Sequence, residues 1–286
     1  MAIESFPNLP NNLDIVNIGS GISDQNFDWS ILPEVRGFNF AIRPEDFRYD
    51  ARIIKNYGNH VKKGGIVIVV VCPLSFGKNE YLYKNYFNEK YIRILPFEDV
   101  DVSLFRYVLF KKIPFIYSFH LFTRKCLYYI KVKIYRLIKK YKMTICLNPV
   151  DNTIKGWIHD SPGLSNLTDP SQSKLFEKVF EEKKADLRTV INNCVEKELI
   201  PVLLVPPICN ELYNKMSSEF LKSFMYDNLK DEINRGIPIL DYSRNIDFTD
   251  DSFFVNGLFL NENKKKMFTK DVYIRTKQLL DNKSGK

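Results

Sequence analysis

The chain has 286 residues, of which 45% are hydrophobic and 14% aromatic. This length and apolar content allow a sizeable core, which argues against a disordered protein and favours one large domain covering residues 1–286. The net charge of +8 is local: residues 121–142 hold eight basic and no acidic residues, which leaves 34 of the 42 basic residues to balance 34 acidic ones.

Cysteine spacing and motif content narrow the class of protein further. The five cysteines are scattered without a CxxC pair, which argues against a metal ribbon or a disulfide scaffold and favours a reducing compartment. The opening residues, MAIESFPNLPNNLD, lack the basic and apolar regions of a signal peptide, and no uncharged apolar run reaches the length of a spanning helix. With no P-loop and no GxGxxG, we expect a cytoplasmic protein without cofactor or metal, and a peripheral position at the inner membrane face stays open.

Short apolar segments alternate with helical patterns along the chain. The expected strands are 13–21, 36–42, 66–72, 200–207 and 237–243. A first helix is expected to open at Pro44 and to stop at Gly64-Gly65, and later ones to cover about 171–198, 214–234 and 261–280. This alternation predicts an α/β fold, a three-layer α/β/α sandwich with a central parallel sheet of the flavodoxin-like type.

Residues 77–166 interrupt the alternation. They contain an aromatic stretch, a basic helix and the expected loop NPVDNTIKGWIHDSPGLSN, and we interpret them as a cap or insertion within the single domain. Ligands of parallel sheets bind beyond the carboxyl ends of the strands. The site is therefore expected at the turns that follow Ile18, Ile42, Cys72, Val205 and Leu240.

Several sequence blocks resemble a known family when they are taken in order. They are VNIGSGISDQNFDW, GFNFAIRPEDFRYDARIIKNY, KKGGIVIVVVCPLSF, PVLLVPP, and PILDYSRNIDFTDDSFFVNGLFLN followed by KKKMFTK. Together they cover most of the chain outside residues 77–166, and their order and spacing resemble the SGNH/GDSL hydrolase-like family. The likeness is greatest to its branch found in bacterial surface-polysaccharide gene clusters.

The resemblance implies a serine nucleophile after the first strand and an Asp-x-x-His pair before a Leu-Asn near the C-terminus. Leu260-Asn261 matches the Leu-Asn, so the histidine position falls on Phe259 and the aspartate position on Asn256. Gly19 matches the glycine of the first turn, which places the nucleophile position on Gly21, one residue after Ser20. All three catalytic roles are thus vacated in this alignment. The oxyanion region would include Gly19, Gly37, Asn39 and Ser75, although Asn39 could equally cap its own turn.

Two functions follow from these positions. The first is a catalytically degenerate protein that acts in surface-polysaccharide biosynthesis by binding a glycan or a partner. The second is an active carbohydrate O-acyltransferase or esterase in which Ser20 pairs with His159, an expected loop residue that is otherwise an ordinary surface histidine. A carbohydrate or acylated glycan is a candidate ligand, and under the first function a lipid-linked intermediate or a partner enzyme is an alternative.

The basic segment suggests a further partner. Apolar residues at helical spacing lie among basic ones in 121–142, as in helices that lie on an anionic membrane surface. The alternative is a helix that faces the core and exposes a solvated basic face. Nucleic acid is not expected. The basic surface comprises Lys131, Lys133, Arg136, Lys139 and Lys140.

Overall fold

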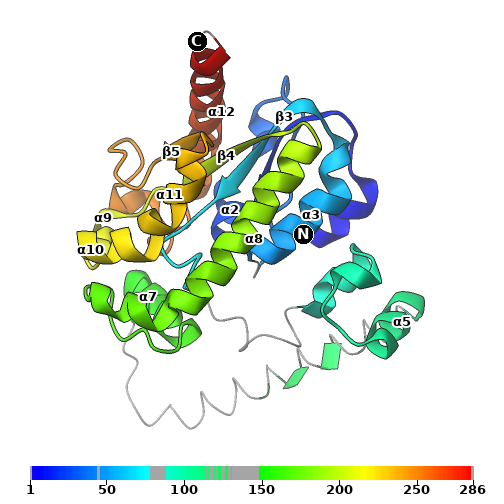
Figure 1. The fold of residues 1–286 in the computed structure, drawn as a ribbon, viewed down its shortest axis with the longest axis horizontal. Coiled ribbons are helices and arrows are strands. Elements are labelled where there is room, and N and C mark those ends of the chain that lie inside the picture. The colour runs from blue at the N-terminus through cyan, green and yellow to red at the C-terminus, as the bar shows by residue number, and fades with distance from the viewer. Residues whose placement is uncertain are drawn as a thin grey trace. The chain divides into compact units, whose positions relative to one another are not determined.

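The computed structural model describes residues 2–43, 46–77, 88–113, 148–284 and, between the last two ranges, 115, 119, 122–123, 126–127 and 130. Five strands form one sheet in the order β2-β1-β3-β4-β5, and every neighbouring pair is parallel (Figure 1). The strands are β1 Leu13–Ile18, β2 Gly37–Asn39, β3 Val61–Val70, β4 Ile200–Val205 and β5 Ile239–Asp241. The predicted parallel sheet is therefore confirmed, and each predicted segment contains a strand, although β3 begins five residues before its predicted start and the other strands end earlier than predicted.

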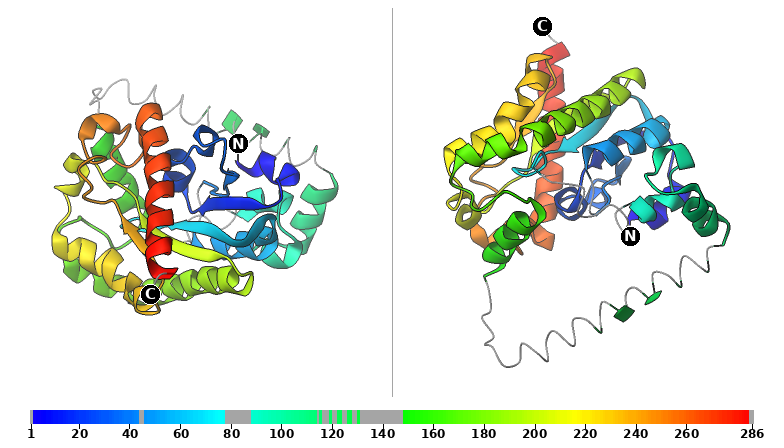
Figure 2. Two further views of the ribbon diagram at one scale, coloured as in Figure 1. Left: turned by 90° about the horizontal axis from the view of Figure 1, so that it is seen from above. Right: turned by 60° about the horizontal axis from the view of Figure 1, so that its bottom comes forward.

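Helices cover both faces of the sheet, which confirms the three-layer α/β/α sandwich. One face carries α3 (Phe47–Tyr57), α8 (Glu177–Glu196) and α11 (Asp227–Asn234), with α3 packed along α8 (Figures 1 and 2). The other carries α2 (Gly21–Asn26) and α12 (Glu262–Ser284), which contact each other. The remaining helices of the unit are α1 Ala2–Ser5, α7 Pro149–Asp160, α9 Asn210–Tyr213 and α10 Ser218–Leu221.

The core explains why β3 reads as an unbroken apolar run. Ile66 and Ile68 pack in one cluster with Phe268 of α12. The intervening Val67 and Val69 are also fully buried, and they face the opposite side because successive strand residues alternate. Because a strand that is covered on both faces has no side in contact with solvent, its sequence does not alternate between apolar and polar residues.

The first predicted helix is wrong at both ends. It begins at Phe47, where the carboxylate of Asp46 accepts a hydrogen bond from the amide of Tyr49 (3.2 Å), and Pro44 lies outside the described residues. It ends at Tyr57, and Gly64-Gly65 lie inside β3. Gly64 has a φ of +72°, and the pairing of β1 with β3 shifts register across this stretch. The two glycines therefore form a bulge in the strand, a feature that also favours glycine.

The later helices differ in detail from their predicted spans. A 3₁₀ segment, Pro170–Phe176, precedes α8. The helix predicted over 214–234 is divided, because a π-helical turn, Lys222–Tyr226, joins α10 to α11. Such a π turn, with i→i+5 hydrogen bonds, is a local insertion within an otherwise continuous helix.

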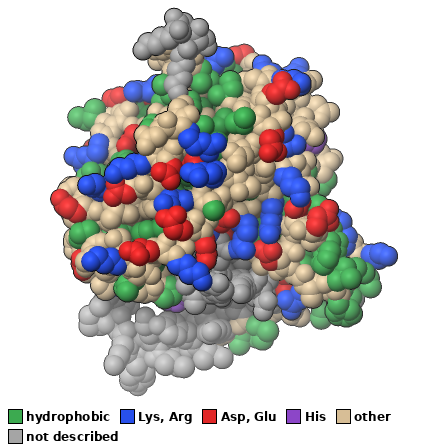
Figure 3. Space-filling view, viewed as in Figure 1, with side chains coloured by type: hydrophobic (Ala, Val, Ile, Leu, Met, Phe, Trp, Pro, Cys, Tyr) green, Lys and Arg blue, Asp and Glu red, His purple; other side chains and the backbone are tan. Residues whose placement is uncertain are grey.

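The chain forms two compact units, Met1–Leu82 with Pro149–Lys286, and Tyr83–Asn148. The smaller unit falls within the predicted insertion, whereas residues 149–166 are grouped with the sheet. In the smaller unit, α5 (Leu104–Lys112) has hydrophobic side chains gathered over it (Figure 3). That this unit is a cap beside the site stays a prediction.

The packing of Gly37 gives a first test. A Cβ at this position would lie 2.6 Å from Cγ of Trp29, a buried ring whose Nε1 donates a hydrogen bond to Oδ1 of Asn17 (2.7 Å). We expect Gly37→Ala to lower the free energy of unfolding by about 1–3 kcal/mol through overpacking. In Gly156→Ala, the new methyl group would meet nothing within 4 Å in α7, so the free energy should rise by about 0.5–1 kcal/mol. Urea denaturation of both variants measures these changes, and equal shifts would contradict the packing argument.

Candidate functional site

The turn after β1 carries Ser20 and Gly21. Gly19 has a φ of +122°, a conformation that glycine adopts without strain. A Cβ on Gly19 would also lie only 3.2 Å from Cβ of Ser23. Ser20 is the N-cap residue of α2, and its side chain makes no capping hydrogen bond to the helix. The turn therefore puts Ser20 and Gly21 at the carboxyl end of β1, where the site was expected.

Phe259 lies directly over Gly21. A Cβ built on Gly21 would be 3.4 Å from Cζ of Phe259 and 2.9 Å from Cδ of Arg43. Two of the three positions marked as vacated are thus neighbours in space, although they come from opposite ends of the chain. A side chain at Gly21 would press against Cδ of Arg43, a flexible and half-exposed side chain that would have to shift to admit it.

Arg43 and Asp24 form an ion pair beside Gly21. Nε of Arg43 lies 2.6 Å from Oδ2 of Asp24, and their side chains are 48% and 20% exposed. Arg43 follows β2, and Asp24 is in α2, so both lie at the same edge of the sheet. The sequence had marked the turn after Ile42 but not these two residues. Only the positions of these residues in the sequence could have indicated them, because a charged residue after a buried strand lies at the edge of the sheet where ligands bind.

Asn256, the third vacated position, holds its own turn together. Its Oδ1 accepts hydrogen bonds from the amides of Leu258 (3.3 Å) and Phe259 (3.0 Å). The next residue, Gly257, has a φ of +88°, which the tight turn requires. The carboxamide therefore serves the backbone of this loop, where a catalytic aspartate would instead accept a hydrogen bond from an imidazole.

Asn26 fastens this loop to α2. Its Nδ2 donates to the carbonyl of Leu258 and its Oδ1 accepts from the amide of Leu260, both at 2.9 Å. Asn26 is fully buried. From the other side, Oγ1 of Thr153 in α7 donates to the carbonyl of Asn256 (2.9 Å). The loop between Phe254 and Leu260, which form an antiparallel bridge, is therefore held on two sides, and this fixes the ring of Phe259 over Gly21.

A second buried asparagine, Asn17, organises the residues that were predicted to form an oxyanion region. Nδ2 of Asn17 in β1 donates to Oγ of Ser23 and to Oδ1 of Asn39, each at 2.8 Å, and its Oδ1 accepts from Nε1 of Trp29 (2.7 Å). Asn39 also accepts from the amide of Ala41 (3.0 Å), so it caps its own turn, and its Nδ2 donates to the carbonyl of Asp24 (3.2 Å). These groups are paired with one another, and Gly37 serves to admit the ring of Trp29.

Ser75 also has a role in a turn. Its Oγ accepts from the amide of Cys72 (2.9 Å) and lies 3.3 Å from the sulfur of that residue. The hydroxyl therefore closes the turn that follows β3. Its place in an oxyanion region stays a prediction.

His159 lies on a helix, and the predicted loop is wrong. It belongs to α7, its side chain is 83% exposed, and Nδ1 lies 3.1 Å from Oδ1 of the neighbouring Asp160. It lies roughly two-thirds of a turn around the helix from Thr153, the residue that faces the loop. Its partnership with Ser20 stays a prediction.

The expected basic surface, from Lys131 to Lys140, lies outside the described residues.

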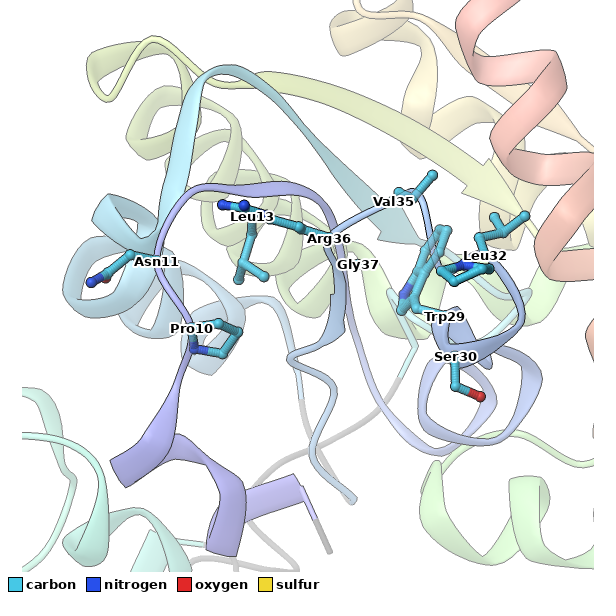
Figure 4. A pocket seen from close by; sticks show the side chains of 10 residues that line it. Pro10, Asn11, Leu13, Trp29, Ser30, Leu32, Val35, Arg36 and Gly37 are labelled. Carbon is cyan, nitrogen blue, oxygen red and sulfur yellow. The ribbon is translucent and has the colours of Figure 1, made fainter.

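A separate pocket opens at the other ends of these strands. It has a volume of about 470 Å³ and lies near the starts of β1 and β2, between Leu13, Trp29 and Arg36 (Figure 4). Ser20 and Arg43 come after the ends of the same strands. The pocket is therefore distinct from the cluster formed by Ser20, Gly21, Asp24, Arg43 and Phe259, which we call the Gly21 cluster.

The Gly21 cluster offers a hydroxyl, a carboxylate, a guanidinium and a phenyl ring. This set can bind a ligand by hydrogen bonds and ring contact, and Phe259, which the predicted alignment places at the histidine position, contributes only a hydrocarbon ring. Within the described ranges, no group of three or more His, Cys, Asp or Glu residues is placed to hold a metal ion. No protein-family model matches the sequence, and no curated protein matches it.

The role of Asn26 gives a second test. Asn26→Ala leaves a buried carbonyl and a buried amide without partners, each of which costs about 1–3 kcal/mol, so we expect the free energy of unfolding to fall by about 2–4 kcal/mol. Its neighbour Gln25 is half-buried and bonds to Asp24 (3.1 Å). Gln25→Ala should change the free energy by no more than about 0.5 kcal/mol. Urea denaturation compares the two.

The same variant should also loosen the loop locally. Cys209 lies beneath Gly257, where an added Cβ would be 3.2 Å from the sulfur, and burial raises the pKa of this thiol to about 11. The thiolate is the reactive form, so we expect Cys209 to resist alkylation at pH 8 in the native protein and to react faster in Asn26→Ala. Peptide mass spectrometry identifies the labelled cysteine. An unchanged labelling rate would mean that Asn26 does not hold the loop.

Proposed function

We propose that this chain is a catalytically silent protein of the SGNH-hydrolase-like type, which acts in the biosynthesis of a bacterial surface polysaccharide by binding a glycan or a partner. The observation that carries the proposal is the phenyl ring of Phe259 over Gly21. Acyl transfer on this fold needs a hydroxyl, an imidazole and a carboxylate in line. At the corresponding positions the chain has a hydrogen atom, a hydrocarbon ring and a carboxamide that is bonded to its own loop.

The remaining groups suit a sugar. A sugar ring has C–H faces that pack against an aromatic ring and hydroxyl edges that both donate and accept hydrogen bonds. Phe259 is half-buried, which leaves part of its ring available for such a contact. Beside it, Arg43 supplies donors and Asp24 supplies acceptors. Sites for small ligands usually combine an apolar surface with a few polar groups.

The absence of acyl chemistry is directly testable. We expect the purified chain to hydrolyse p-nitrophenyl acetate at the rate of the buffer, because no described group of the cluster is an imidazole that could take the proton of a serine. Ser20→Ala and His159→Ala should give the same rate. Turnover by the native chain that both substitutions abolish would overturn the proposal and establish the alternative, an esterase or O-acyltransferase that uses Ser20 and His159.

Ligand binding tests the positive part of the proposal. Against a panel of neutral and uronic-acid oligosaccharides, we expect the native chain to bind a neutral member. Phe259→Ala and Arg43→Ala should each weaken that binding about tenfold, the equivalent of about 1.4 kcal/mol. Arg275→Ala is the matched control, because Arg275 is also about half-exposed and ion-paired, with Nε 2.7 Å from Oδ2 of Asp271, but it lies on α12. Isothermal titration calorimetry measures the affinities. Equal losses in all three variants would place the sugar elsewhere.

A further inference from the structure

The helix α5 of the smaller unit turns its apolar side outward. Leu104, Phe105 and Val108 are all exposed, Phe105 to 78%. Their spacing puts them on one face of the helix together with Leu109 and the exposed Lys112. A surface helix of a globular protein has the opposite arrangement, with the apolar stripe toward the core.

Polar contacts on the inner side of α5 hold the helix in this orientation. Arg106 points inward and pairs with the buried Glu89 (2.9 Å). Tyr107 donates a hydrogen bond to the carbonyl of Leu95 (3.1 Å), and Nζ of Lys111 donates to that of Ile92 (3.2 Å). The polar side chains thus hold the helix to its own unit, where only Phe110 is a buried apolar residue of α5.

Exposed apolar residues continue beyond α5. Phe115, Phe119 and Phe122 are each exposed and follow the i, i+4, i+7 spacing of a helix face. Ile130 is exposed as well. Large apolar side chains in such a concentration mark an interaction surface, since a protein in water ordinarily exposes them singly.

The charge of this region favours one kind of partner. From residue 102 to residue 150 the sequence has eleven basic residues and no acidic one. Among the described residues, Lys112 lies on the outward face of α5 itself. A face that combines aromatic and aliphatic side chains with positive charge is complementary to the surface of an anionic membrane, which has an apolar interior beneath negatively charged headgroups.

We propose that the outward face of α5, with Leu104, Phe105, Val108 and Lys112, docks on an anionic lipid surface. Phe105 and Leu104 would enter the boundary between headgroups and acyl chains, and the basic residues would contact the phosphates. The chain would lie on the bilayer, since none of the helices in the described ranges has the length and apolar character to cross one. This role goes beyond glycan binding and does not depend on it.

Vesicle sedimentation of the full chain tests the proposal. We expect binding to phosphatidylcholine vesicles that contain phosphatidylglycerol, weaker binding to phosphatidylcholine alone, and release as salt is raised. Leu104→Ser combined with Phe105→Ser should lower the partition coefficient about tenfold on anionic vesicles. Ile246→Ser is the matched control, because Ile246 is also highly exposed but belongs to the sheet unit, and it should leave partitioning unchanged. Circular dichroism checks that each variant is folded.

The other outcomes are equally decisive. No sedimentation with anionic vesicles at low salt would overturn the proposal. So would binding that the double variant leaves unchanged, because another part of the chain would then carry it. If light scattering shows an oligomer that the double variant converts to a monomer, the face of α5 is covered by a second copy of the chain, and the lipid proposal is wrong.

Discussion

The arrangement of the Gly21 cluster depends on the side chain of one buried residue, Asn26. A carboxamide carries one donor group and one acceptor group, as a peptide does, and Asn26 uses them on a carbonyl and an amide that lie 232 and 234 residues further along the chain. In the interior these hydrogen bonds are strengthened by the low dielectric, and leaving them unmade is expensive. The side chain of Asn26 therefore joins the loop between Phe254 and Leu260 to α2 through two hydrogen bonds, as the backbone of a neighbouring strand would.

This attachment decides which chemistry is available. Along the loop, Leu258 and Leu260 are buried while Phe259 between them is half-buried, so the alternation that secures the loop also directs the ring of Phe259 toward Gly21. Under the proposed family resemblance, an active hydrolase would have an imidazole and a serine at these two positions. In this chain, Phe259 has a ring without a basic nitrogen, and it lies beside a residue without a side chain.

The fold was more predictable from the sequence than the site. Strands such as 66–72 stand out because burial on both faces demands a run of β-branched residues. Gly64-Gly65 misled the prediction, since glycine ends helices and forms bulges with equal ease. His159 was assigned to a loop although its segment is helical. Asn26 gave no signal at all, because a buried asparagine looks like an exposed one until its distant partners are known.

The ion pair between Asp24 and Arg43 narrows the ligand that the cluster can take. Since the two charges already compensate each other at 2.6 Å, an anionic ligand would have to displace Asp24 from the guanidinium before it gained the same contact. A sugar hydroxyl faces no such competition, because it can donate to the carboxylate and accept from the guanidinium while the pair stays intact. Electrostatics therefore favour a neutral sugar over an acidic one at this site, whereas the positive charge that attracts anions lies in the acid-free segment that contains α5. The two surfaces differ in kind, and the two proposals assign each of them a different partner.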